Sequence, residues 1–329
     1  MKKIQDLNLA FIGVSHWHVP LYLEGVERES LHVAAVSDPD GTIAEQAGSR
    51  LNCRVYTDYR ELLCREKPDF VFAFAPHYEM PLLALELIRL QIPFAIEKPL
   101  GLGAFDVYRV LKEAKKKGVF CAIPFVWRHS LLIREFKEKV RPEEILHLSF
   151  RFIAGPPSRY EVPSPWMLKK QMAGGGCMTN LGVHFIDMAM YLTESEDGRV
   201  LGSSYHFDPR YDVEIYGASL SRLSSGATLA LETGYAFPME EEKRDNRWNI
   251  ITKNGYYTLG DGCFEERIFG EAVKRTRMST DSDIYYSDFL IHSLEEYLAG
   301  RRPEAGLEEM LVTRKLLDEM NAKAGEVPE

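Results

Sequence analysis

The sequence has no long hydrophobic run, few cysteines and no excess of positive charge. None of its apolar runs approaches the roughly 18 residues that a membrane span needs. The stretch 7–14 after Lys2-Lys3 is too short and interrupted for a secretory signal. The five cysteines are widely spaced without a CxxC pair, which is typical of buried or free thiols in a reducing cytoplasm. Lys and Arg number 40 against 49 Asp and Glu, and the net charge of −9 argues against a nucleic-acid-binding protein. We therefore expect a cytoplasmic protein without membrane or nucleic-acid partners.

The length of 329 residues suits about two domains, and the first 125 residues show a repeating pattern. Helical patterns such as 107–117, which ends at Gly118, alternate with short apolar runs. These runs lack period-two alternation, which indicates strands covered on both faces, at 9–12, 33–36, 70–74, 94–96 and 119–123. The repetition predicts an α/β fold with a doubly wound parallel sheet.

Beyond about residue 125 the pattern changes to strands with partial alternation. Asn254-Gly255 between two apolar runs predicts a hairpin. A last helical pattern at about 307–322 follows a turn at 300–303, and this helix could pack back on the first domain. The expected strands are 145–152, 213–220, 227–231 and 248–252. These patterns therefore predict that the second half forms an α+β domain with a mixed, largely antiparallel sheet.

The first strand ends in a loop where a dinucleotide-binding fold would place its phosphate loop. Gly13 occupies the first glycine position, but Ser15 and His18 stand at the second and third. The Ser15 hydroxyl can donate to a phosphate. The second strand ends at Asp38, whose carboxylate can accept from a ribose and would repel a 2′-phosphate. The alternative is that Ser37 to Asp40 is only a turn with a helix cap.

A charged pair, Glu97-Lys98, follows the fifth apolar run and precedes Pro99. The carboxyl ends of parallel strands are where open α/β sheets bind ligands. A lysine there can hold a substrate oxygen as a compact cation, although a plain loop entry has the same appearance.

The third candidate segment is a triple glycine, 174–176, followed at once by a helical pattern. The glycines let the backbone pass close to a ligand or another chain. Asn180 and His184 share a helix face, and Asp187 lies nearby. His184 could exchange a proton with a hydroxyl, or it could be a satisfied histidine in a domain interface. We expect no metal site, because His16-x-His18 needs a third partner that the sequence does not identify.

These segments, in this order and spacing, resemble the Gfo/Idh/MocA family of NAD(P)-dependent oxidoreductases over nearly the whole chain. Glu97-Lys98-Pro99-Leu100 is the most specific signature, and Gly174–Gly176 to His184 and Asp187 is the second. The resemblance implies a Rossmann dinucleotide-binding domain at 1–125 and a substrate-binding and oligomerisation domain at 126–329. In relatives the outer face of the second domain's sheet forms a dimer interface, so a homodimer or homotetramer is expected.

The resemblance also implies roles for individual residues. Lys98 would orient the substrate oxygen beside the nicotinamide, through a cis Lys98–Pro99 bond. His184 would be the acid/base, and position 180, usually aspartate in relatives, is Asn180. Cofactor binding is expected at Gly13, Ser15, His16, Asp38, Ala75, Pro76, Glu97 and Lys98. Substrate binding is expected at Lys98, Arg128, Trp166, Asn180 and His184.

The implied function is hydride transfer between NAD, or NADP, and a hydroxyl carbon of a sugar, cyclitol or related polyol. Asp38 favours NAD. Because two loop glycines are missing and position 180 is Asn180, a second function is an alternative: a non-catalytic sensor or regulatory member of the family that binds a nucleotide or sugar. An NAD-dependent glycosidase-type relative is the third alternative.

Overall fold

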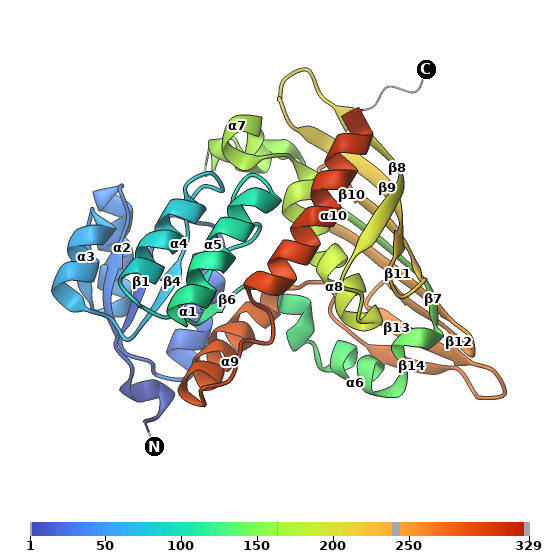
Figure 1. Cartoon of the computed structure of the whole chain (residues 1–329), viewed down its shortest axis with the longest axis horizontal. Coiled ribbons are helices and arrows are strands. Elements are labelled where there is room, and N and C mark those ends of the chain that lie inside the picture. The colour runs from blue at the N-terminus through green and yellow to red at the C-terminus, as the bar shows by residue number, and fades with distance from the viewer. Residues whose placement is uncertain (1, 163, 239–243, 326–329) are drawn as a thin grey trace. The chain divides into compact units, whose positions relative to one another are not determined.

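A computed structural model describes residues 2–162, 164–238 and 244–325, which divide into two compact units (Figure 1). The first unit contains Met1–Pro124 and Asp283–Met310, and the second contains Phe125–Ser282 and Leu311–Glu329. The chain therefore returns to the first unit after leaving it, and the helix α10 (Leu307–Gly325) begins in one unit and ends in the other.

The first unit is built on a six-stranded parallel sheet with the strand order β3-β2-β1-β4-β5-β6. The central strands are buried along their whole length, as apolar runs without alternation predict. The strands are β1 (Leu9–Ile12), β2 (Val33–Ser37), β3 (Arg54–Tyr56), β4 (Phe70–Ala73), β5 (Phe94–Ile96) and β6 (Cys121–Ala122).

Helices connect these strands, and their ends follow the local sequence. Asp40 caps α2 by accepting hydrogen bonds from two backbone amides, and Gly118 ends α5 in the left-handed region. The helices α4 and α5 pack side by side, as Figure 1 shows. The helices of this part are η1 (Ile4–Asp6), α1 (Val19–Arg28), α2 (Gly41–Leu51), α3 (Tyr59–Glu66), α4 (Met80–Arg89) and α5 (Ala104–Lys117).

The returning segment completes the first unit with η7 (Asp283–Tyr285) and α9 (Tyr286–Leu298). The helix α9 packs against α1, where Gly25 leaves room for the backbone of Ser287. Arg28 forms an ion pair with Asp288 at 2.8 Å, and the Ser287 hydroxyl donates to the carbonyl of Leu21. The first unit therefore needs residues from both ends of the sequence.

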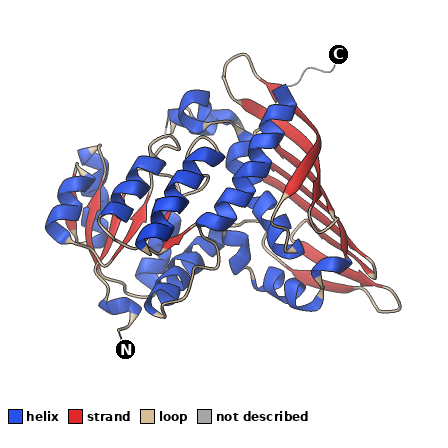
Figure 2. Ribbon diagram, in the orientation of Figure 1, coloured by secondary structure: helices blue, strands red, loops and turns tan. Residues whose placement is uncertain are grey.

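The second unit is built on an eight-stranded sheet with the order β14-β13-β12-β11-β7-β10-β9-β8. Figure 2 draws the long strands of this sheet in red, next to one another. Among the residues of this sheet that the structure describes, only β7 and β10 pair in parallel, and the other pairs are antiparallel. The strands are β7 (Ile145–Ala154), β8 (Gly198–Phe207), β9 (Glu214–Leu223), β10 (Thr228–Gly234), β11 (Arg244–Thr252), β12 (Gly255–Gly260), β13 (Cys263–Ile268) and β14 (Lys274–Arg277).

A helix α8 (Val183–Thr193) packs against β7 and β10 and forms the core of this unit with aromatic side chains. Phe185 of α8 contacts Phe150, and both lie near Trp248. The remaining helices are η2 (Val126–His129), α6 (Leu131–Lys139), η3 (Pro142–Glu144), η4 (Pro157–Tyr160), η5 (Pro165–Leu168), α7 (Lys170–Ala173) and the π-helix η6 (Met178–Gly182).

The fold class that the sequence predicts is confirmed: a doubly wound parallel sheet and a mixed, mostly antiparallel sheet. The hairpin at Asn254-Gly255 joins β11 to β12. The patterns did not identify β3, β8, β13 and β14, which are largely exposed or rich in charged residues. Within the described ranges, no helix is long and apolar enough to span a membrane.

Candidate functional site

The carboxyl ends of four neighbouring strands bring the first unit's candidate residues to one edge of the sheet. Ile12 of β1 pairs with Ser37 of β2 and with Ala73 of β4, and Ala73 pairs with Ile96 of β5. The next residue along each strand is therefore at this edge. These residues are Gly13, Asp38, Phe74 and Glu97.

Gly13 is required by the geometry of the loop after β1. Its φ of +81° is a conformation that side chains rarely adopt. A Cβ atom at this position would lie 2.1 Å from the carbonyl oxygen of Phe74. The loop therefore passes directly over the end of β4, as the first glycine of a dinucleotide loop does.

Asp38 is 3% exposed and joins the loop to the end of β2. Its Oδ2 accepts from the amide of Ser15 at 2.7 Å, and its Oδ1 accepts from the amide of Asp40 at 3.0 Å. The helix cap that the sequence left as an alternative is Asp40, not Asp38. Each carboxylate oxygen has a second lone pair, so Asp38 can also accept from ribose hydroxyls.

The backbone amides of the loop are mostly engaged within the chain. The amide of His16 donates to the carbonyl of Gly13, and the amide of Val19 donates to the carbonyl of His16. Pro20 has no amide hydrogen, and Ser15 donates to Asp38 as described. The exposed hydroxyl of Ser15 is the loop's additional donor for a phosphate. The edge therefore fits NAD through a tight glycine turn, a buried carboxylate with lone pairs left to accept from a ribose, and this hydroxyl.

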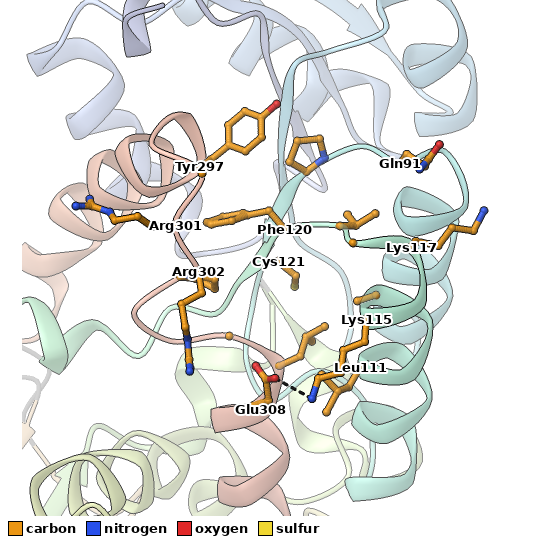
Figure 3. A pocket seen from close by; sticks show the side chains of 18 residues that line it. Gln91, Leu111, Lys115, Lys117, Phe120, Cys121, Tyr297, Arg301, Arg302 and Glu308 are labelled. Carbon is orange, nitrogen blue, oxygen red and sulfur yellow. Dashed lines mark ion pairs between the residues drawn. The ribbon is translucent and has the colours of Figure 1, made fainter. Parts of the chain in front are cut away.

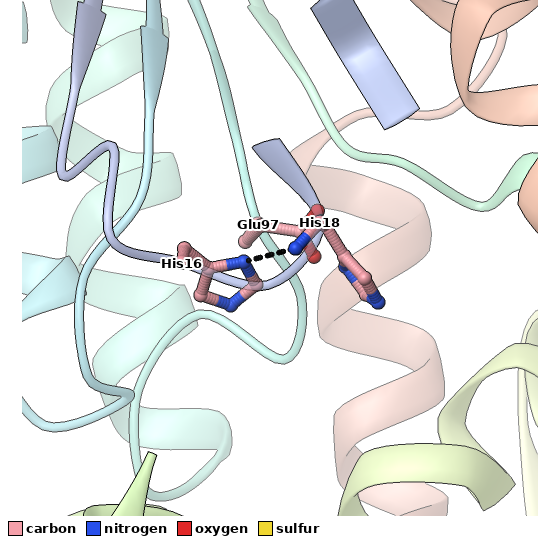
Figure 4. Close-up of side chains that lie close together, drawn as sticks. All are labelled: His16, His18 and Glu97. Atoms are coloured by element: carbon pink, nitrogen blue, oxygen red, sulfur yellow. Dashed lines mark hydrogen bonds and ion pairs between the residues drawn. The ribbon is translucent and has the colours of Figure 1, made fainter. Parts of the chain in front are cut away.

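Two histidines and Glu97 form a cluster beside this loop (Figure 4). The amide of His18 donates to Nδ1 of His16 at 3.2 Å. Nδ1 of His18 lies 3.0 Å from Oε1 of Glu97, and the Tyr22 hydroxyl donates to the same oxygen at 3.0 Å. His18, which stands at the third glycine position, thus connects the loop to the sheet through its contact with Glu97 at the end of β5.

The ionisation of the cluster follows from its burial and charges. Burial lowers the pKa of His16 well below its ordinary value, so this ring is neutral at pH 7. Burial opposes ionisation of Glu97, but the charge and hydrogen bond of His18 outweigh it and hold the pKa of Glu97 below its usual range. Oε2 of Glu97 is buried and has no hydrogen-bond partner among the described residues.

Lys98 is the second residue after the end of β5, next to Glu97, and its exposed fraction is 3%. The Lys98–Pro99 peptide is cis, which confirms the expectation from the sequence. Burial lowers the pKa of Lys98 to about 8, although the charges of Glu97 and Asp283 oppose the shift. Lys98 is therefore a cation at neutral pH, and it can lose its proton when the pH is only slightly higher.

Two further predicted cofactor residues lie at the end of β4. Ala75 and Pro76 are half-buried, and the carbonyl of Pro76 accepts from the amide of Glu79 before α4. Their position at the same edge as Gly13 fits contact with a bound dinucleotide through the backbone.

A cavity of about 530 Å³ in the first unit lies at the other edge of the sheet (Figure 3). Pro93 and Phe120, which precede β5 and β6, line it together with Lys115 and Glu308, whose ion pair is 2.9 Å. Because it adjoins the amino ends of the strands, this cavity is separate from the residues that follow their carboxyl ends.

In the second unit the triple glycine allows the chain to pass close to its own strand β9. A Cβ atom on Gly176 would lie 2.0 Å from the carbonyl oxygen of Glu214. The buried Glu214 carboxylate accepts from the amides of Gly176 at 2.7 Å and Met178 at 3.0 Å. Burial raises the pKa of Glu214 despite these bonds. The close approach expected of these glycines is thus to the protein itself, and sequence patterns gave no signal for Glu214.

Asn180 lies in η6, buried between two tyrosines. Its Nδ2 donates to the hydroxyl of Tyr160 at 3.1 Å and to that of Tyr235 at 3.0 Å. The side-chain amide of Asn180 thus donates two hydrogen bonds. An ionised aspartate has no hydrogen to donate and could not make them. Tyr235 was not a candidate from the sequence, because it lies in a loop 55 residues further along.

His184 is half-buried on α8, one turn after Asn180, with its ring edge-on to Phe125 at 6.4 Å between centroids. Asp187, on the next turn, forms a two-point ion pair with Arg128, with distances of 2.9 Å and 2.6 Å. Both partners are almost fully buried, so Arg128 fixes η2 to the helix that carries His184. Trp166, the other predicted substrate residue, is half-buried in η5.

Comparison with known proteins places this architecture in a family. Residues 7–125 match the model of an oxidoreductase family with an NAD-binding Rossmann fold, and residues 139–258 match the GFO/IDH/MocA C-terminal domain. The solved structure of levoglucosan dehydrogenase in complex with NADH and levoglucosan has a similar fold, with a TM-score of 0.86 over 97% of each chain at 13% identity.

Two curated relatives are similar over part of their sequences. D-glucoside 3-dehydrogenase of Escherichia coli (strain K12) is 27% identical over 236 residues, 65% of this chain and 66% of the relative. The dTDP-3,4-didehydro-2,6-dideoxy-alpha-D-glucose 3-reductase of Saccharopolyspora spinosa is 28% identical over 211 residues, 62% of this chain and 60% of the relative. The chain thus spans 60% to 66% of these relatives' length.

The two family models match in the order of the two units and together cover most of the chain. The resemblance inferred from the signatures is confirmed: the chain belongs to the Gfo/Idh/MocA family of oxidoreductases, and its first unit contains that family's NAD-binding Rossmann fold.

Proposed function

We propose that the protein transfers a hydride between NAD and a hydroxyl carbon of a sugar or related polyol. The observation that carries this proposal is Lys98, a buried cation with a pKa lowered to about 8 at the carboxyl end of β5. A charged amine buried at a ligand-binding edge costs stability, and substrate binding is the physical reason that accounts for it. The relatives act on sugars, as a glucoside 3-dehydrogenase and a hexose 3-reductase.

Three residues of this chain perform the acid–base and orienting work. When bound, the nicotinamide supplies the hydride-accepting or hydride-donating carbon. Lys98 donates a charge-assisted hydrogen bond to the reacting oxygen and so stabilises the negative charge that develops there. His184 takes the hydroxyl proton in oxidation and returns it in reduction. Asn180 binds a neighbouring sugar hydroxyl without itself taking a proton.

The cofactor preference follows from Asp38. Its buried carboxylate accepts ribose hydroxyls favourably, whereas a 2′-phosphate would bring a second negative charge against it. NAD(H) should therefore bind more tightly than NADP(H), and calorimetry with both cofactors measures the ratio. Equal affinities would remove Asp38 as the selecting residue.

Turnover by variants tests the roles. His184→Ala should abolish reduction of NAD with D-glucosides while the affinity for NADH stays within about twofold, because general acid–base catalysis contributes about 10²–10⁴-fold. His206→Ala, which changes an exposed histidine of β8 in the same unit, is the matched control. Unchanged turnover in His184→Ala would remove this residue from the reaction.

A non-catalytic sensor is the second candidate, and the engaged amides of the phosphate loop and Asn180 favour it. A sensor would bind NADH and a sugar without reduction of NAD across a broad panel of sugars and polyols. Reproducible turnover of any of these substrates would exclude this candidate.

We further propose that the protein is a cytoplasmic homodimer or homotetramer that associates through the outer face of its eight-stranded sheet. The five cysteines are free thiols, as suits a reducing compartment. Leu201 and Leu220 are exposed by 45% and 42% beside a shallow cavity over β7 to β10. Exposed leucines on a sheet face favour an interface. Leu220→Glu should give monomers in analytical ultracentrifugation, whereas the exposed Leu82→Glu of α4 should not.

A further inference from the structure

The cluster of His16, His18 and Glu97 has the composition of a metal site. One potential donor atom from each residue lies within 4.8 Å of the other two. Two imidazoles and one carboxylate are a ligand set that zinc uses in sites that retain an open position. The third partner that the sequence did not reveal comes from the end of β5, 79 residues after His18.

A second observation independent of this composition points to a ligand. Glu97 is 1% exposed, and its Oε2 has no hydrogen-bond partner among the described residues. An ionised carboxylate oxygen that is buried without a donor costs free energy, so a cation or donor beside it would be strongly stabilised. Neither Tyr22 nor His18 supplies this contact, since both bond to Oε1.

We propose that His16, His18 and Glu97 bind one divalent transition-metal ion, which ties the loop after β1 to the end of β5. Imidazole and carboxylate donors together suit Zn²⁺, Co²⁺ and Ni²⁺ better than Ca²⁺ or Mg²⁺. This proposal can be tested independently of the proposed dehydrogenase activity, because metal binding is measured without substrate or NAD.

The existing hydrogen bonds show how the ion is accommodated. His16 exchanges the 3.2 Å bond from the His18 amide for a metal bond at Nδ1, and its ring is already neutral. His18 coordinates through Nδ1 once this nitrogen has released its proton to solvent, and its Nε2 faces the Tyr286 hydroxyl at 3.4 Å. The Tyr22 hydroxyl continues to donate to Glu97 and orients the coordinating carboxylate.

The site also accounts for the unusual loop sequence. A histidine stands at the third glycine position, where a glycine in the dinucleotide-binding fingerprint allows close packing of the helix against the strand. His18 replaces that close packing by contacts to Glu97 and to Tyr286 of α9. A bound ion would hold these elements together where the glycines would otherwise have done so.

Titration of the chelator-treated full-length protein with Co²⁺ and Zn²⁺ tests the proposal. We expect one ion per chain by calorimetry, visible d–d absorption for Co²⁺ without a thiolate charge-transfer band, and displacement of Co²⁺ by Zn²⁺. Glu97→Gln keeps the shape of the side chain and should weaken Co²⁺ binding at least about 100-fold. His16→Ala/His18→Ala should abolish the binding.

The double variant His32→Ala/His206→Ala, which removes two exposed histidines, is the matched control and should bind Co²⁺ as the unaltered chain does. Circular dichroism checks that each variant is folded. If His16→Ala/His18→Ala does not fold, Glu97→Gln alone tests the site. The absence of stoichiometric binding to the unaltered chain would overturn the proposal. A thiolate band, or equal affinity in Glu97→Gln and the control, would also overturn it by locating the ion elsewhere.

Discussion

At the scale of single residues, the unusual groups are charges buried at strand ends. Lys98 and Glu97 are adjacent and nearly inaccessible, and Asp38 and Glu214 are buried carboxylates bonded to backbone amides. Asp38 and Glu214 accept hydrogen bonds from backbone amides, although burial still raises the pKa of Glu214. Burial likewise disfavours the charged form of Lys98 and lowers its pKa to about 8. A buried amine whose pKa is lowered at a strand end is a candidate for substrate binding.

Replacement of Lys98 should therefore raise stability while it removes activity. The folded-state pKa of about 8 lies below the usual value, so the protonated amine destabilises the folded state at pH 7. Lys98→Met should increase the free energy of unfolding by about 1–3 kcal/mol at pH 7, since one pKa unit corresponds to about 1.4 kcal/mol. The gain should shrink as the pH rises through 8 towards the unfolded-state pKa, because the folded Lys98 is then neutral. Urea unfolding measures this, with the exposed Lys116→Met as control; a destabilised Lys98→Met would contradict it.

The same pKa predicts a pH dependence of catalysis. If the protonated Lys98 stabilises the reacting oxygen, kcat/KM should fall above an apparent pKa of about 8 as the amine loses its proton. Lys98→Arg keeps a charge at every accessible pH, so its lower kcat/KM should lack this basic limb. Initial rates from pH 6 to 10 with saturating NAD distinguish the outcomes, and an unchanged limb in Lys98→Arg would assign it to another group.

At the scale of elements, the loop between β1 and α1 departs from the three-glycine pattern of a dinucleotide-binding loop. Its amides bond within the chain, its one essential glycine is Gly13, and His18 bonds to Glu97 at the end of β5. The loop is therefore held by side-chain contacts rather than by the close backbone packing of a glycine-rich turn.

Gly13 should consequently tolerate no side chain. Gly13→Ala combines a positive φ with a Cβ atom 2.1 Å from the Phe74 carbonyl oxygen, so the backbone must move. We expect a loss of at least about 3 kcal/mol in the free energy of unfolding and weaker NADH binding. Gly118→Ala is the matched control, because its φ of +68° is also positive but nothing lies within 4 Å of its Cβ position. Its cost should be only about 1–2 kcal/mol. Equal losses in the two variants would show that the contact with Phe74 is not limiting.

The elements also show how far the sequence alone could go. Apolar runs and the Asn254-Gly255 turn predict β1, β2, β4, β5 and the β11–β12 hairpin, because burial on both faces and turn chemistry are local properties. The exposed β8 and charged β14 give no such signal, since pairing with neighbours defines them. Likewise the edge residues Gly13, Asp38 and Lys98 could be predicted, whereas the contacts of Glu214, Tyr235 and Tyr286 depend on segments distant in sequence.

At the scale of the whole molecule, the first unit is not a continuous stretch of chain. Residues 283–310 return to it, and their aromatic side chains extend its core. Tyr297 packs against Phe70 and Phe120, and Phe289 packs against Tyr22 of α1. Tyr286 bonds to His18 in the loop of the candidate site. The segment that completes the core thus also supports the site.

A polypeptide of residues 1–125, which contains the whole matched Rossmann region, should therefore not fold cooperatively by itself. Without α9 it exposes the apolar faces of α1 and of the β4–β6 region that Phe289 and Tyr297 cover, and it loses the ion pair between Arg28 and Asp288. A polypeptide in which a flexible linker joins residues 1–125 to residues 283–310 keeps these contacts and should unfold in a single cooperative transition. Thermal unfolding by circular dichroism and the dispersion of amide proton resonances compare the two. Cooperative unfolding of residues 1–125 alone, with the Tm of the linked form, would show that the returning segment is not part of the folding unit.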